Sequence, residues 1–90
     1  MWVNVRVSLV GTFRQESRQS ELLLSFRSEE GRVRLKDVLD GLKKRGLEFG
    51  QGLGGAVVLI DGKNAWLMGG LEAEVVDGAT VVIMSFAGGG

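Results

Sequence analysis

A single segment of this 90-residue chain has the apolar spacing of a long amphipathic helix, and this limits the fold more than any other feature. Leu35, Val38, Leu39 and Leu42 follow the i, i+3, i+4, i+7 rule, with charged residues between them. Basic residues fill the last turn, and Gly46 is expected to end the helix in a left-handed conformation. One helix covers only one face of a sheet, so the other face stays uncovered.

The strands are predicted from two-residue alternation, β-branched residues and glycine turns. The segments with these features are residues 2–10, 21–26, 56–60, 64–67 and 80–86. Residues 71–76 are expected to be irregular or extended. Inside the predicted helix, Gly41 costs about 1 kcal/mol relative to alanine and is expected to mark close packing on the sheet.

The order of these elements is strand, strand, helix, then several strands. Because the first and last strands are both apolar, they are the natural central pair of a sheet that lies beneath the helix. The pattern predicts an α+β fold of the β-grasp (ubiquitin-like) class, with a mixed four- to five-stranded sheet and one main helix packed on one face. Residues 1–86 would form this domain, and residues 87–90 a flexible glycine tail.

Composition narrows the function. Eleven basic and eleven acidic residues cancel, which argues against a nucleic-acid partner. No apolar run approaches the roughly 20 residues of a membrane span, and no secretory signal is visible, so a cytoplasmic protein without a membrane partner is expected. The chain has neither Cys nor His, which removes the commonest metal ligands and general base. We therefore expect no metal site and no enzyme activity.

Two motifs are interpreted as surface features. Residues 50–55 have the spacing G-x-G-x-x-G, but a helix precedes them and a strand follows, which favours a flexible connector over a nucleotide site. Glu29 and Glu30 lie in a predicted turn, whereas Glu72 and Glu74 alternate with apolar residues. These four carboxylates are interpreted as solvated surface rather than as a catalytic or metal-binding pair.

Aromatic residues are the candidates for partner contacts. Trp66 is expected to pack on the core or on a sheet face, and the position of Trp2 stays open between packing and partner binding. The last predicted strand is expected to border a docking surface on the uncovered sheet face, with Phe86 as the first candidate contact.

The final residues, Gly88, Gly89 and Gly90, cannot add to a core. Glycine lets a backbone pass through a narrow channel that any β-carbon would block. A terminal carboxylate on such an arm can be activated without help from side chains of its own. The tail therefore favours a protein that reacts through its C-terminus.

The last third of the chain resembles a known family. Residues 57–65 and 70–83, followed by Phe86-Ala87-Gly88-Gly89, are similar to the strand, Asn-Gly, Asp-Gly-Asp-x-Val and Val-Ala-Gly-Gly succession of MoaD/ThiS-like sulfur carriers, which include the small subunit of molybdopterin synthase. The Asn-Gly turn of the family is Asp61-Gly62 in this chain. The helix segment 33–42 is also similar. This chain departs from the family in lacking proline before the tail and in having one further glycine, Gly90.

The resemblance implies a carrier rather than an enzyme. A ubiquitin-activating-type adenylyltransferase (MoeB/ThiF-like) would use ATP to adenylate the terminal glycine, and no cofactor would bind the carrier itself. Sulfur would then replace AMP to give a thiocarboxylate, which a synthase large subunit uses as sulfide donor. The reactive end would be Gly90, or Gly89 if Gly90 is removed, while Gly88 and Gly89 thread the partner's channel.

The pathway stays open at this point. Molybdopterin or tungstopterin cofactor synthesis is the first expectation from the resemblance. The alternatives are a ubiquitin-like modifier conjugated to lysines, or a sulfur carrier for thiamine synthesis, tRNA thiolation or cysteine synthesis.

Overall fold

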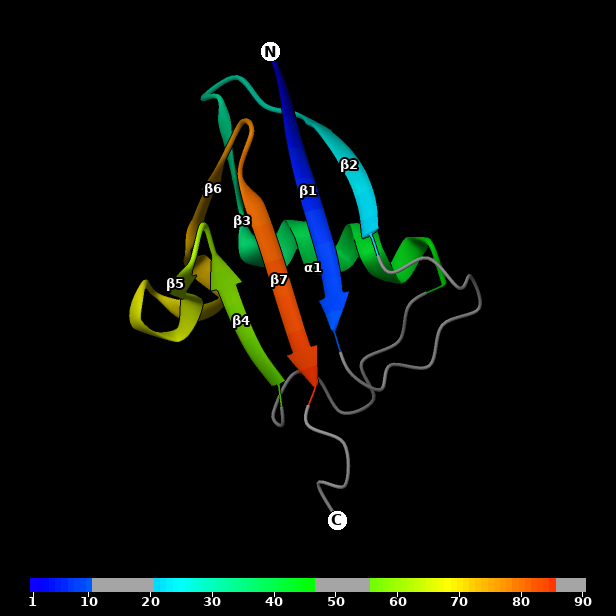
Figure 1. Cartoon of the computed structure of the whole chain (residues 1–90). Coiled ribbons are helices and arrows are strands. Elements are labelled where there is room, and N and C mark those ends of the chain that lie inside the picture. The colour runs from blue at the N-terminus through cyan, green and yellow to red at the C-terminus, as the bar shows by residue number, and fades with distance from the viewer. Residues whose placement is uncertain (11–20, 47–55, 86–90) are drawn as a thin grey trace.

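A computed structural model describes residues 1–10, 21–46 and 56–85 as one sheet, one helix and a small second sheet (Figure 1). The order of elements is β1 (Trp2–Val10), β2 (Glu21–Arg27), β3 (Arg32–Arg34), α1 (Leu35–Lys44), β4 (Ala56–Ile60), β5 (Lys63–Asn64), the 3-10 helices η1 (Ala65–Leu67) and η2 (Gly70–Glu72), β6 (Glu74–Val76) and β7 (Thr80–Ser85).

The main sheet has five strands in the order β2-β1-β7-β4-β5. The first and last strands, β1 and β7, are parallel neighbours near the middle of the sheet, and the other pairs are antiparallel. Helix α1 crosses one face only (Figure 1). The predicted α+β class, the mixed sheet and the central pairing of the first and last strands are therefore confirmed.

The core lies between the sheet and α1, and alternation along each strand builds it. Every second residue of β1 is buried, from Val3 to Leu9, and Val81 and Ile83 of β7 lie beside them in the core. The fully buried side chains of the helix are Leu35, Val38 and Leu42. These are residues of the predicted apolar stripe, so the interpretation of this segment as an amphipathic helix is confirmed.

Local hydrogen bonds explain where α1 begins and ends. At its start, the Asp37 carboxylate accepts a bond from the Arg34 backbone N–H at 2.9 Å, which satisfies a donor that has no partner within the helix. At its end, Gly46 has φ 88° and its N–H donates to the Lys43 carbonyl at 3.0 Å. Gly46 thus has the left-handed backbone expected from the sequence.

Two parts of the chain differ from the sequence prediction. Residues Arg32–Arg34 form a strand, β3, which was not predicted and which pairs with β6 in a separate two-stranded sheet. The irregular or extended conformation expected for residues 71–76 is found, as the end of η2 followed by β6. The strand expected at 64–67 is only Lys63–Asn64. The chain then turns into η1, because the Asn64 side chain accepts a bond from the Trp66 N–H at 2.9 Å. No helix in the described segments is long and apolar enough to cross a membrane.

Candidate functional site: the open sheet face at the end of β7

The residues predicted to react or to bind partners lie outside the described residues. They are Phe86, Gly88, Gly89 and Gly90, and the predicted boundary between domain and tail at 86/87 lies outside as well. The structure does describe the strand that leads to them. β7 ends at Ser85, so residues 80–85 show which surface surrounds the point where the tail begins.

β7 is held firmly on both sides. It pairs with β1 from Thr80 to Met84 and with β4 from Val81 to Ser85. Its first residue is also fixed by Asp61, whose Oδ1 accepts a bond from the Thr80 N–H at 2.9 Å. A strand in the interior of a sheet has no free edge, so its end is a rigid base for whatever follows.

Alternation places a row of apolar side chains on the face opposite α1. Because Val81 and Ile83 are buried under the helix, Val82 and Met84 must point to the other face. The pairing register brings residues of the two neighbouring strands beside them. The open-face patch defined in this way consists of Val10, Val57, Leu59, Val82 and Met84.

The patch is apolar although no described helix covers it. Val10 is 47% exposed, and the other four side chains are half-buried by their neighbours in the sheet. In Figure 1 the strands lie in front of α1, which leaves this face toward the viewer. Polar residues border the patch on the same face: Ser8 lies beside Val82, and the paired Arg6 and Thr80 lie further from the end of β7. An apolar patch with a polar border is typical of a protein-binding surface.

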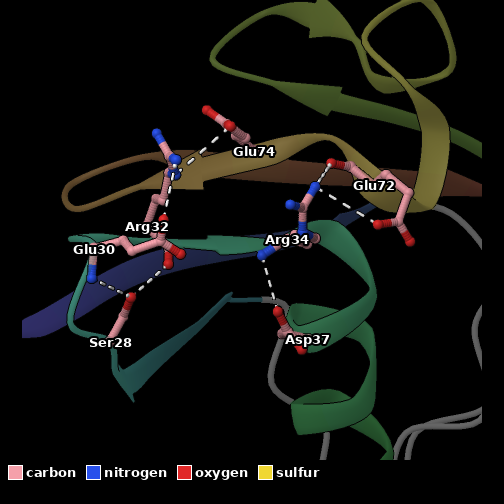
Figure 2. Close-up of polar contacts among 7 residues, drawn as sticks. All are labelled: Ser28, Glu30, Arg32, Arg34, Asp37, Glu72 and Glu74. Carbon is pink, nitrogen blue, oxygen red and sulfur yellow. Dashed lines mark hydrogen bonds and ion pairs between the residues drawn. The ribbon is translucent and has the colours of Figure 1, made fainter.

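Glu72 and Glu74, singled out from the sequence, pair with arginines rather than with each other. Figure 2 shows Glu72 facing Arg34 and Glu74 facing Arg32, with closest ion-pair contacts of 3.6 Å in each case. Glu72 also pairs with Lys36 at 3.0 Å. Their side chains are 57% and 51% exposed, so the interpretation as solvated surface is confirmed. Within residues 1–10, 21–46 and 56–85, no three acidic side chains gather as metal ligands.

The two tryptophans are more exposed than a core position allows. Trp66 was expected to pack, but it lies on η1 and is 41% exposed, with its ring beside Gly70 rather than in the core. Leu67, next to it, is 86% exposed. Trp2 is 56% exposed, and the Arg27 guanidinium carbon lies 5.7 Å from the centre of its ring, within the range of a cation–π contact.

Comparison with known proteins gives matches among solved structures. The small archaeal modifier protein 1 from Methanosarcina acetivorans is 26% identical, with a TM-score of 0.73, and the alignment covers 100% of this chain and 99% of that one. Urm1 from Trypanosoma brucei is 23% identical, with a TM-score of 0.73 and coverage of 99% and 97%. A Haloferax volcanii protein is 21% identical, with a TM-score of 0.71 and coverage of 99% and 88%. No protein-family model and no curated protein matches the sequence.

These matches span the whole chain, so they concern the complete arrangement of sheet and helix rather than a shared motif. The predicted ubiquitin-like β-grasp architecture is thereby confirmed.

Proposed function

We propose that this chain, a ubiquitin-like β-grasp protein of the MoaD/ThiS-like type, is a carrier or modifier that acts through the carboxylate of its C-terminal glycine. The observation that carries the proposal is the full-length match to a small archaeal modifier protein. The open-face patch at the end of β7 supports it. A partner that docks on Val82 and Met84 stands directly beside the origin of the tail.

In the proposed reaction, Gly90 supplies the attacking carboxylate. An E1-like activating enzyme of the MoeB/ThiF type joins the carboxylate oxygen to the α-phosphorus of ATP and releases pyrophosphate. A sulfide equivalent then attacks the carbonyl carbon, AMP leaves, and the product is a thiocarboxylate. Gly88 and Gly89 lack the β-carbon that would obstruct a narrow channel on this route.

The chain would be a substrate rather than an enzyme, would bind no cofactor of its own, and would work in the cytoplasm. We propose that its thiocarboxylate donates sulfur to the large subunit of a synthase, first of all in molybdopterin or tungstopterin cofactor assembly. Thiamine synthesis, tRNA thiolation and cysteine synthesis use the same donor chemistry and are the alternative pathways.

Intact-protein mass spectrometry tests the reactive end. The protein is incubated with its cognate activating enzyme, ATP and a sulfur source, and we expect a mass gain of one sulfur-for-oxygen exchange. The tail length matters because each residue spans at most about 3.3–3.6 Å, so one surplus glycine moves the carboxylate by that distance. We expect the full-length chain to react and the form without Gly90 to fail. Reaction of the truncated form alone would place the active end at Gly89.

Gly89→Ala provides the control for threading. Its carboxylate and length are unchanged, but its added methyl group should block activation. If Gly89→Ala reacts as fast as the wild-type protein, threading through a narrow channel is wrong. If none of these forms gains AMP or sulfur, the carrier proposal fails.

A second candidate, a modifier joined to lysines of other proteins, is favoured by the name of the Methanosarcina relative, which is a modifier protein. Both functions begin with the same adenylate and differ in the nucleophile that attacks it. In the second case a lysine amine replaces AMP and forms an isopeptide bond. Expression of a tagged chain in cells distinguishes them. Higher-mass conjugates that disappear in the Gly89→Ala variant support the modifier, and a thiocarboxylate without conjugates supports the carrier.

A further inference from the structure

A groove of about 650 Å³ lies between β2, β3 and α1, on the helix side of the sheet. Its apolar lining consists of Leu24, Phe26, Val33 and Gly41. The groove is separate from the open-face patch, because Leu24 and Phe26 point toward the helix side whereas the patch lies on the opposite face. Neither the proposed adenylation nor the sulfur transfer uses this groove.

One wall of the groove is the free edge of β2, which pairs only with β1 in the described sheet. In an antiparallel pair, alternate residues direct their N–H and C=O groups toward the partner strand, and the others direct them away. The Leu23 carbonyl accepts a bond from Arg45 Nη2 at 3.3 Å, on the side away from β1. The peptide groups of Leu23, Ser25 and Arg27 therefore face outward, along the groove.

The floor of the groove is shaped by Gly41. A Cβ at this position would lie 3.2 Å from Cζ of Phe26 and 3.5 Å from Cδ1 of Leu24. The prediction that Gly41 marks close packing on the sheet is thereby confirmed. Phe26 is half-exposed at the groove, so an apolar side chain of a bound ligand could pack on its aromatic ring.

Basic residues outnumber acidic residues in the lining of the groove. Its four acidic side chains already have partners, which are Arg32 for Glu30 and Glu74, Lys44 for Asp40, and the Arg34 backbone N–H for Asp37. Among the residues that the structure describes, Arg27 and Arg45 have no carboxylate within ion-pair distance. Arg45 reaches the edge from α1, whereas the Arg27 guanidinium lies against the Trp2 ring on the open face, where the outer side chains of an added strand would meet it. The two arginines belong to opposite ends of the β2 edge, which spans about 13 Å between Leu23 and Arg27.

We propose that this groove binds an extended peptide segment of a partner protein, which adds a strand to β2 and carries carboxylates on both sides of a short apolar stretch. Strand addition to a free edge is a recurring mode of peptide recognition, in which backbone bonds give affinity and pockets give specificity. A compact anion would leave the outward peptide groups of β2 unused.

Peptide binding exchanges hydrogen bonds without leaving a polar group unpaired. The Arg45 guanidinium moves from the neutral Leu23 carbonyl to a peptide carboxylate, which is a stronger, charge-assisted contact. A peptide N–H then donates to the Leu23 carbonyl in place of Arg45. In the free protein, the same arginine covers part of an edge that would otherwise pair with other chains.

The probe is the synthetic peptide acetyl-Asp-Glu-Val-Ser-Val-Ser-Val-Glu-Asp-amide, added to the full 90-residue chain while amide chemical shifts are recorded by NMR. We expect shifts along β2 and the C-terminal turn of α1, and weaker binding as salt is raised. Two control peptides, with proline in place of the central valine or of the serine before it, have the same charge as the probe. The valine N–H faces β2 if the peptide runs parallel to it, and the serine N–H does so if the peptide runs antiparallel. One of the two control peptides should therefore bind at least about tenfold more weakly.

Ser25 provides a test on the protein side. Its N–H faces outward, so Ser25→Pro keeps the pairing with β1 but removes a donor from the edge. Ser25→Ala loses the same hydroxyl group and keeps the donor. We expect Ser25→Ala to bind as the wild-type chain does, and Ser25→Pro to bind at least about tenfold more weakly.

A test at Arg45 gives a result even if Ser25→Pro does not fold. Arg45→Ala should lower affinity about five- to tenfold, whereas Lys43→Ala, which removes a neighbouring exposed cation outside the groove, should stay within about twofold. Equal affinities for Arg45→Ala and Lys43→Ala would overturn the proposal. So would shifts centred on Val82 and Met84, or no shift with the peptide at all. Deletion of Gly90 should leave peptide binding unchanged. Failure of the peptide to bind can therefore be distinguished from failure of the proposed chemistry at the C-terminus.

Discussion

Val10 and Val76 offer a matched test of whether the open-face patch binds the activating enzyme. The two valines are 47% and 50% exposed, so an aspartate at either position costs the free protein a similar amount. Val10 belongs to the patch beside Met84, whereas Val76 lies on β6 in the small second sheet. We expect only Val10→Asp to weaken the complex.

The expected size of the effect follows from burial. Fully burying a valine contributes about 1.5–3 kcal/mol, so the exposed half of Val10 supplies about 1 kcal/mol in a complex. A carboxylate without a partner in that interface costs about another 1–3 kcal/mol. The total of about 2–4 kcal/mol corresponds to a loss of affinity of roughly 30- to 700-fold. In the free protein, both variants should lose about 1–2 kcal/mol of unfolding free energy.

The assay is ATP–pyrophosphate exchange by the activating enzyme, with each variant as the substrate. KM should rise for Val10→Asp while kcat stays near the wild-type value, because Val10 contacts the enzyme surface and not the reacting carboxylate. Urea denaturation of both variants checks that their stabilities match. Equal KM values for the two variants, or a larger rise for Val76→Asp, would refute the assignment of the patch.

Three further predictions concern stability, each measured by urea denaturation. Leu42→Ala, in the fully buried stripe of α1, should lower the free energy of unfolding by about 2–5 kcal/mol, and a loss below 1 kcal/mol would contradict the described core. Asp61→Ala removes the side-chain acceptor of the Thr80 N–H and places alanine at φ 49°, so we expect a loss of about 1–3 kcal/mol, with a smaller loss for Asp61→Asn. Glu72→Gln breaks two exposed ion pairs and should cost less than about 1 kcal/mol, a difference that disappears at high salt; a larger, salt-independent loss would argue against that geometry.

The parts of the fold that depend on local patterns were predictable from the sequence. Alternation from Val3 to Leu9 places β1 and its buried face, and the apolar stripe of α1 shows which helix face packs on the sheet. The two Asp-Gly pairs mark real turns, with positive φ at Gly62 and Gly78. These features depend on neighbours in sequence, which is why a single chain displays them.

The parts that depend on distant contacts were missed. In β3, only Val33 is apolar between two arginines, which is too short for a period, and the strand exists because Val33 pairs with Val75, 42 positions later in the chain. The site has the same limitation. An uncovered, partner-binding face was expected, but its members Val57 and Leu59 emerge only from the register between β4 and β7. Phe86, the contact named from the sequence, lies outside the described residues.

The parallel pairing of β1 with β7 also determines how the domain responds to force. Trp2 and Ser85 lie at opposite ends of this central pair, so a load that pulls on them draws the two strands past each other lengthwise. The five residue pairs from Arg6–Thr80 to Val10–Met84 then share the load, because the strands slide as a unit rather than separate one bond at a time. A load applied instead between Glu21 and Val10 would peel β2 from β1 pair by pair. We expect single-molecule pulling in the first geometry to need clearly higher force than in the second, so the points of attachment determine how strongly the same domain resists unfolding.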